Sequence, residues 1–138
     1  MGIDYGTKRV GIAVTDPLQI FASGLQTVAT HKLLDFLGDY FSRENVTEIV
    51  IGYPKKMNNQ PSDTVKHIDP FIRRLKQLYP EKKIILADER LTSKIAFRSM
   101  IDAGLKRKQR QNKELVDQIS ATLILQEHLE RRKIDRID

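Results

Sequence analysis

The stretch G-I-D-Y-G-T-K-R-V-G-I-A-V-T-D, residues 2–16, decides how the sheet of this chain begins. Within it, Val10–Val14 is a short apolar run of the kind that forms a buried strand. Met1–Tyr5 precedes that run and Gly6-Thr7-Lys8 lies between, so the stretch predicts a β-hairpin whose first strand is short. Asp4 falls on this first strand. A carboxylate at the rim of a buried strand is costly unless a partner compensates its charge, so Asp4 is the first candidate site residue.

The composition fits a globular chain with an anionic partner. A length of 138 residues suits one domain, and we expect residues 1–138 to form a single domain. There is no cysteine, which excludes disulfides and thiolate metal sites. No apolar run approaches the ~18 residues that span a bilayer, and no signal-peptide core is found, so we expect a cytoplasmic protein without a membrane partner. The net charge of +6 favours nucleic acid as a partner.

Strands and helices alternate along the rest of the chain. Further strands are predicted at Phe21–Val28, Glu48–Tyr53 and Lys83–Ala87, and helices at His31–Phe41, 61–78, Thr92–Ala103 and Glu114–Arg132. Pro70, inside the second of these helices, predicts a kink or a fresh helix start, because proline has no amide proton to donate. Strand–helix alternation implies parallel strands, whereas the opening hairpins are antiparallel. The sequence therefore predicts an α/β fold with a mixed five-stranded sheet and helices on both faces.

Three more acids are attached to predicted core elements. Asp88 and Glu89 end the last strand, and Asp117 continues an apolar stripe of the final helix toward its N-terminus. Beside Asp117, Ser120 and Ala121 are small and would let this helix lie close to a sheet. Carboxylates that converge without basic partners repel one another, and a hard cation such as Mg²⁺ or Mn²⁺ removes that repulsion. A divalent metal site is therefore one interpretation of these acids.

Each acid also has an ordinary structural interpretation. Asp4 could accept hydrogen bonds from turn amides, as aspartate often does. Asp117 could be favoured by the dipole at the start of its helix. Asp88 could pair with Arg90 or cap the following helix. The histidines have no metal-ligand spacing and are interpreted as residues of solvated helix faces; they are His31, His67 and His128.

The segment Leu105–Lys113 is a basic loop that directly precedes the helix carrying Asp117. Its cations include Lys106, Arg107, Lys108 and Arg110, and it contains no acid. Such charge runs are usually solvated connections between helices. Because this one stands next to the proposed acidic site, we predict that it offsets the negative field there and binds phosphates of a nucleic acid.

Four motifs, spread in order over nearly the whole chain, are similar to those of a known family. They are G-I-D-Y-G-T-K-R-V-G-I-A-V-T-D, I-V-I-G-Y-P-K-K-M-N, D-E-R-L-T-S and D-Q-I-S-A-T-L-I-L-Q. Together they resemble the YqgF family, also called the RuvX or Holliday-junction-resolvase-like family. The resemblance implies a ribonuclease H-like fold and a cytoplasmic bacterial nuclease that processes the 5′ end of pre-16S ribosomal RNA.

Carried over by position, the resemblance places the catalytic and metal-binding acids at Asp4, Glu89 and Asp117. The tip of the fourth strand, Gly52-Tyr53-Pro54, has no acid, so Glu89 is the acid that the sheet supplies there. In a two-metal scheme one ion activates water and the other stabilises the leaving oxygen.

The same resemblance places basic and polar side chains around these acids. Thr7, Lys8 and Arg9 would lie near the cleaved strand. Because Asp88 and Arg90 stand on either side of Glu89 along the strand, we also expect Arg90 to pair with an acid or reach a phosphate, and Asp88 to orient the acids without binding the metal. The implied partners are structured precursor ribosomal RNA or branched DNA, and ribosomal particles.

Three other functions compete with the RNA nuclease. The chain could be a Holliday junction resolvase acting on four-way DNA, or a non-catalytic nucleic-acid-binding module of ribosome assembly. An actin-like ATPase or sugar kinase would need two such domains and a second phosphate loop, and 138 residues suit only one domain. Metal-dependent cleavage that is lost in Asp4→Asn would separate the enzyme from the binding module.

Overall fold

A mixed sheet of five strands organises the part of the chain that the computed structural model describes, residues 1–53, 63–88 and 112–137. The strands are β1 (Gly2–Tyr5), β2 (Arg9–Thr15), β3 (Ala22–Ala29), β4 (Glu48–Tyr53) and β5 (Lys83–Asp88). Their order across the sheet is β3-β2-β1-β4-β5, so the short first strand lies at the centre. β1, β2 and β3 are antiparallel neighbours, whereas β1, β4 and β5 run parallel. The predicted hairpins and the predicted mixture of directions are therefore confirmed.

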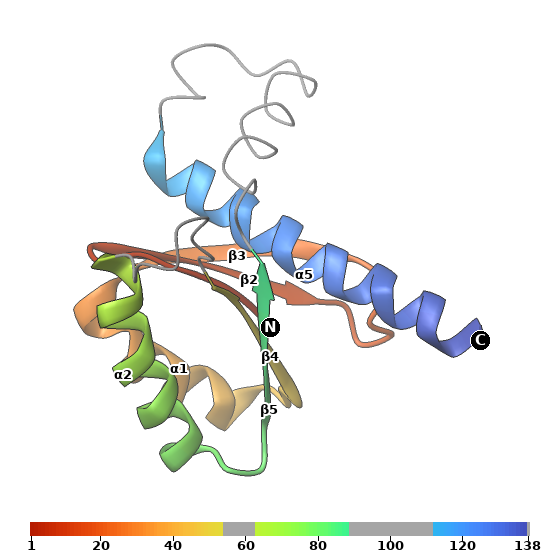
Figure 1. Cartoon of the computed structure of the whole chain (residues 1–138), viewed down its shortest axis with the longest axis horizontal. Helices are drawn as coiled ribbons and strands as arrows, with labels where there is room; N and C mark the ends of the chain where they lie inside the picture. Colours follow the sequence, from red (N-terminus) through yellow and green to blue (C-terminus); the bar gives the residue numbers. More distant parts are fainter. Residues whose placement is uncertain (54–62, 89–111, 138) are drawn as a thin grey trace.

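Helices cover both faces of the sheet (Figure 1). One face carries the 3-10 turn η1 (Thr30–Lys32), α1 (Leu33–Arg43) and α2 (Asp63–Leu78), and the other carries α5 (Lys113–Ile137). α5 runs obliquely across β2, β3 and β1 and reaches β4. None of the described helices combines the length and the apolar character that a membrane-spanning helix requires.

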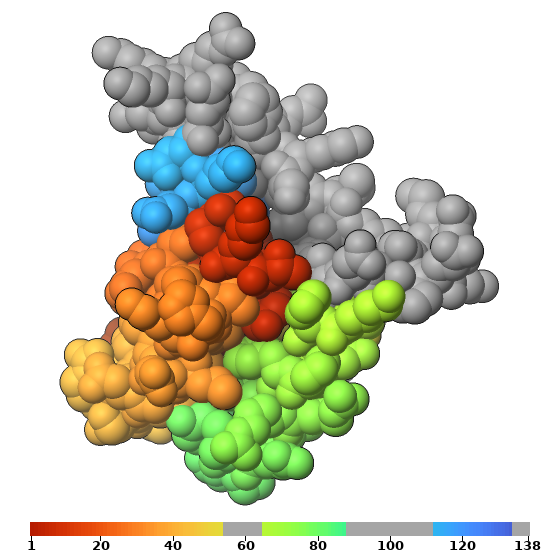
Figure 2. Space-filling view, turned by 90° about the vertical axis from the view of Figure 1, so that its left-hand side faces the viewer, coloured from red at the N-terminus to blue at the C-terminus, as the bar shows by residue number. Residues whose placement is uncertain are grey.

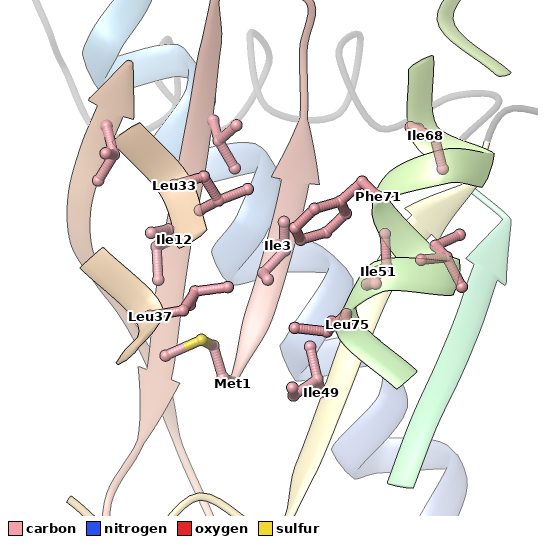
Figure 3. Packing of buried hydrophobic residues seen from close by; sticks show 13 residues of the cluster. Met1, Ile3, Ile12, Leu33, Leu37, Ile49, Ile51, Ile68, Phe71 and Leu75 are labelled. Carbon is pink, nitrogen blue, oxygen red and sulfur yellow. The ribbon is translucent and has the colours of Figure 1, made fainter. Parts of the chain in front are cut away.

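The larger part of the core lies between the sheet and the α1/α2 layer. Figure 3 shows Ile3 of β1 at its centre, with Leu37 of α1 on one side and Leu75 of α2 on the other. These three side chains are fully buried. A second, smaller cluster lies under α5, where Ala13 and Val50 face the helix. Because strand side chains alternate between the two faces, these two clusters fix which residues of each strand point toward α5.

Within the described residues, the helix and strand bounds agree with the sequence prediction to within a few residues, with two differences; the helix predicted at Thr92–Ala103 lies outside the described residues. α2 continues through Pro70 as one helix, so the fresh helix start that the sequence offered as one alternative does not occur. Pro70 is exposed, so water can satisfy the carbonyl that loses its amide partner, and the buried stripe on the opposite side holds the helix together. α5 begins at Lys113 and ends at Ile137, which makes it longer at both ends than the predicted Glu114–Arg132.

Candidate active site

Asp4 lies on the central strand and belongs to the sheet face that α5 covers. In the β1–β2 hairpin Asp4 is paired with Gly11, and directly opposed residues of an antiparallel pair point to the same face. Its neighbours Ile3 and Tyr5 point to the other face, where Ile3 is buried in the core and Tyr5 stacks on Phe71. Asp4 is partly exposed, so its carboxylate is held by a rigid strand yet remains reachable from solvent.

Gly11 brings Asp117 onto the same spot. A Cβ added at Gly11 would overlap the backbone carbonyl of Asp117 and would lie 3.0 Å from the Cβ of Asp117. The absence of a side chain at Gly11 therefore lets α5 approach the sheet at Asp117, directly above the residue paired with Asp4. Two predicted site acids, 113 positions apart in the chain, thus come from different elements to one place on the sheet. The small residues Ser120 and Ala121 are buried, and a Cβ at Gly2 would lie 2.8 Å from the Ala121 carbonyl, which confirms the predicted close approach of α5 to the sheet.

Asp117 forms an ion pair with Arg9. The Nε of Arg9 donates to Oδ2 of Asp117 at 2.8 Å, and the two side chains are 35% and 21% exposed. This contact changes two expectations. The acids were expected to converge without basic partners of their own, and Asp117 has one. Arg9 was expected to be a substrate contact, and in this structure its guanidinium instead orients the carboxylate, leaving Oδ1 of Asp117 outside this hydrogen bond.

The turn between β1 and β2 holds Thr7 and Lys8 at the same edge. Thr30 fixes the turn from two sides, because its hydroxyl donates to the Gly6 carbonyl at 2.7 Å and its amide donates to the Lys8 carbonyl at 3.0 Å. A Cβ at Gly6 would lie 2.5 Å from the Arg9 carbonyl, so glycine is required by the turn itself. Thr7 and Lys8 are exposed on this anchored turn, where a phosphate could reach them.

The other predicted site residues fall at or beyond the end of β5. Asp88 is the last residue of that strand, and its backbone is in register with Tyr53 of β4. The side chain of Asp88 lies outside the described part of the structure. So do six further predicted residues, four of them the cations of the basic loop: Glu89, Arg90, Lys106, Arg107, Lys108 and Arg110. Within the described residues, no group of three or more acids or histidines is placed to hold a metal ion.

Two features of this edge were missed by the sequence analysis. Tyr53, at the end of β4, donates its hydroxyl to Oδ1 of Asp69 on α2 at 2.9 Å. This hydrogen bond to a carboxylate, with some desolvation, raises the pKa of Tyr53 above its ordinary value. The other missed feature is the role of Gly11, which the V-G-I-A-V pattern did signal, since glycine inside a strand often marks a close backbone approach.

A cavity of about 410 Å³ lies at the opposite edge of the sheet, and neither Asp4 nor Asp117 lines it. His128 borders it with its ring nitrogen 3.2 Å from a carboxylate oxygen of Glu48, and Arg132 approaches the same oxygen at 3.3 Å. The interpretation of His128 as a solvated surface residue was therefore wrong, because the helix turns it toward the start of β4. We assign the candidate site to the carboxylates of Asp4 and Asp117 and not to this cavity, because carboxylates can bind a metal ion whereas a cavity volume alone indicates no chemistry.

The fold and the paired carboxylates define a class of α/β protein that carries acids on a central strand and on a helix packed across it. The model of the RuvX family, described as Holliday junction resolvase, matches residues 1–131, and the chain belongs to this family. The sheet and helices are accordingly those of a ribonuclease H-like fold, as the motifs implied.

Curated relatives match over nearly their whole length. A protein of Bacteroides thetaiotaomicron is 56% identical over 133 residues, 96% of each chain. One from Flavobacterium johnsoniae is 53% identical over 133 residues, again 96% of each chain. One from Porphyromonas gingivalis is 49% identical over 130 residues, 94% of each chain. All three carry the name "Putative pre-16S rRNA nuclease".

Proposed function

We propose that this protein is a divalent-metal-dependent endonuclease that hydrolyses phosphodiester bonds at the 5′ end of pre-16S ribosomal RNA. One observation carries the proposal. Asp117 lies over Gly11, the residue that is paired with Asp4 in the β1–β2 hairpin, and Lys8 lies on the adjoining turn. The names of the relatives support the RNA substrate. We further propose that the protein works in the bacterial cytoplasm, on free precursor RNA or on ribosomal particles.

The residues at this site suit a hard divalent cation. Mg²⁺ and Mn²⁺ prefer carboxylate oxygens, and two carboxylates on separate, rigid elements face the same side of the sheet. Asp4 and Asp117 would hold the ion, and Glu89, which follows β5 in the chain, would complete the set. The ion, when bound, supplies an activated water and a positive charge beside the leaving oxygen.

The chain's own residues position these groups. Arg9 fixes the rotamer of Asp117 through Oδ2, as a partner outside the ligand set commonly orients a ligand carboxylate. Thr7 and Lys8 would bind a phosphate of the substrate, because both are exposed on a turn that Thr30 anchors. Arg90 and the four cations at 106–110 are proposed to contact the RNA backbone. Asp88 is proposed to orient the metal-binding acids without binding the ion itself.

The activity test is cleavage of a labelled precursor RNA in the presence of Mg²⁺ or Mn²⁺. Asp4→Asn and Asp117→Asn should each lower the rate by at least ~10²-fold, as removal of one electrostatic element of a preorganised site typically does. Asp39→Asn is the matched control, because Asp39 is an exposed acid of α1 that pairs only with Arg43. Normal cleavage by Asp4→Asn would exclude the proposed site.

Metal binding can be measured without turnover. Titration of the wild-type protein with Mn²⁺, followed by electron paramagnetic resonance, should show a bound ion that both Asp4→Asn and Asp117→Asn weaken and Asp39→Asn does not. If Mn²⁺ binding is unchanged in a variant that carries both Asp4→Asn and Asp117→Asn, the ion binds elsewhere. If the protein binds RNA but neither binds Mn²⁺ nor cleaves, the non-catalytic assembly module is the better interpretation.

A second candidate function is resolution of four-way DNA junctions in recombination or repair. The description of the matching family as Holliday junction resolvase favours it. The two functions are separated by comparing kcat/KM for a precursor RNA and for a four-way DNA under the same conditions. A preference for the junction would favour the resolvase, and cleavage of the RNA alone would favour the ribosomal function.

A further inference from the structure

The outward face of α2 carries four exposed cations. The buried side of this helix is formed by Ile68, Phe71, Ile72 and Leu75, which pack on the sheet. The cations on the remaining sides are Lys66, Arg73, Arg74 and Lys76. We call these four residues the α2 basic face.

The four residues of the α2 basic face are spread along the axis of the helix. With a rise of 1.5 Å per residue, Lys66 and Arg73 are about 10 Å apart along the axis, and Lys66 and Lys76 about 15 Å. Seven residues are close to two full helical turns, so Lys66 and Arg73 share one side of the helix, opposite Leu75. Arg74 and Lys76 flank this line on either side.

The α2 basic face is not neutralised within the described part of the chain, where no ion pair joins any of its four side chains. Exposed arginines on the other helices differ. Arg43 of α1 pairs with Asp39, and Arg131 of α5 pairs with Glu127, each one helical turn away. On α2, Asp69 is engaged by the hydroxyl of Tyr53. Four uncompensated charges on one helix favour an anionic partner.

The helix that carries this face reaches the same edge of the sheet as the candidate site, although α2 covers the face of the sheet opposite Asp4. The Tyr53–Asp69 hydrogen bond joins α2 to the end of β4, and the Tyr5–Phe71 stack joins it to the end of β1, one residue after Asp4. Figure 2 shows α2 in green beside the red β1–β2 segment, with the start of α5 in light blue on the same side of the molecule. A strand that reaches Lys8 on the β1–β2 turn can therefore continue along α2.

We propose that the α2 basic face binds the phosphate backbone of the RNA that flanks the cleaved bond. This inference rests on the proposed function and adds a second contact surface to it. The only Phe, Tyr or Trp residue of α2 is Phe71, which is buried, so the face offers no exposed ring of these types for a base to stack on. It therefore recognises charge and not sequence. At ~3.4 Å per phosphate along one strand of a duplex, the ~15 Å length of the face along the helix axis corresponds to about four phosphates.

The test is a quadruple variant, Lys66→Gln, Arg73→Gln, Arg74→Gln and Lys76→Gln. Glutamine keeps a high helix propensity, and all four positions are exposed, so the fold should persist. The matched control removes the same charge from other surfaces: Arg43→Gln, Lys83→Gln, Arg131→Gln and Lys133→Gln. Circular dichroism and thermal unfolding confirm that both variants are folded. Binding to two precursor RNAs of unrelated flanking sequence is then measured over a range of salt, without a divalent metal.

The α2 variant should bind both RNAs at least about tenfold more weakly than the control, since each lost phosphate contact removes ~0.7–0.9 from the slope of log K against log salt. Four contacts correspond to a slope shallower by about 3. The KM of cleavage should rise while kcat at saturating RNA stays near that of the wild type.

Each other outcome contradicts the inference. An α2 variant that matches the control in affinity and slope would show that this face does not bind the RNA backbone, while leaving the proposed function intact. A loss confined to one of the two sequences would contradict backbone recognition. A wild-type protein that binds neither RNA would refute the proposed RNA substrate together with this inference.

Discussion

Replacing Gly11 by alanine tests the contact that builds the candidate site. The added methyl group would coincide with the backbone carbonyl of Asp117 and approach its Cβ to 3.0 Å. Overpacking of a tight contact typically costs ~1–3 kcal/mol. Here the overlapping atoms are backbone atoms of a helix that packs along three strands, so no single side chain can turn away and the cost should lie near about 3 kcal/mol.

Urea and thermal unfolding measure this cost. A loss of about 3 kcal/mol corresponds to a fall in Tm of about 6–12 °C for a chain of this size. Gly38→Ala is the matched control, because a Cβ at Gly38 in α1 meets only the Tyr79 hydroxyl at 3.5 Å, an ordinary contact. That helical replacement should stabilise the protein by ~0.5–1 kcal/mol. If Gly11→Ala is as stable as the wild type, α5 is not seated on Gly11 in solution and the argument for the site fails.

Three further predictions follow from single contacts. Arg9→Gln should lower the free energy of unfolding in urea by at most ~1 kcal/mol, since the pair with Asp117 is partly exposed. It should raise the free-energy barrier of cleavage by more than it lowers the free energy of unfolding, and equal changes in the two would contradict the orienting role of Arg9. Asp69→Asn should lower the pKa of Tyr53 toward its ordinary value by removing a charged acceptor; an unchanged phenolate absorbance titration would contradict this. Leu37→Ala should cost ~2–5 kcal/mol, because the side chain is fully buried; a loss below ~1 kcal/mol in urea unfolding would contradict its place in the core.

Much of the fold could be predicted because the local patterns are strong. Continuous apolar runs such as Glu48–Tyr53 are short and end at turn residues, and the structure has a strand with the same bounds. The fresh helix start that was one alternative at Pro70 does not occur, because tertiary burial of the stripe around it outweighs the loss of one hydrogen bond. Local rules at a single residue are less reliable than the periodicity of the segment that contains it.

The candidate site could be predicted only in part. The alternation of β1 and the stripe of α5 pointed to Asp4 and Asp117 separately, and each position had an ordinary alternative interpretation. What brings them together is a contact between distant segments at Gly11, and no local pattern encodes such a contact. The Arg9–Asp117 pair was missed for the same reason, since its partners are 108 residues apart. The replacement Asp117→Asn leaves Arg9 without its carboxylate partner, so we expect it to lower stability as well as activity.

The position of α5 at the end of the described chain has a consequence for biosynthesis. All five strands are synthesised before residues 113–137, so the face of the sheet with Ala13 and Val50 on it lacks α5 as its cover until that segment is made and released. The same segment carries Asp117. A nascent chain can therefore complete neither its second core nor its carboxylate pair until the last helix docks, and covering the sheet and assembling the candidate site become a single late event in synthesis.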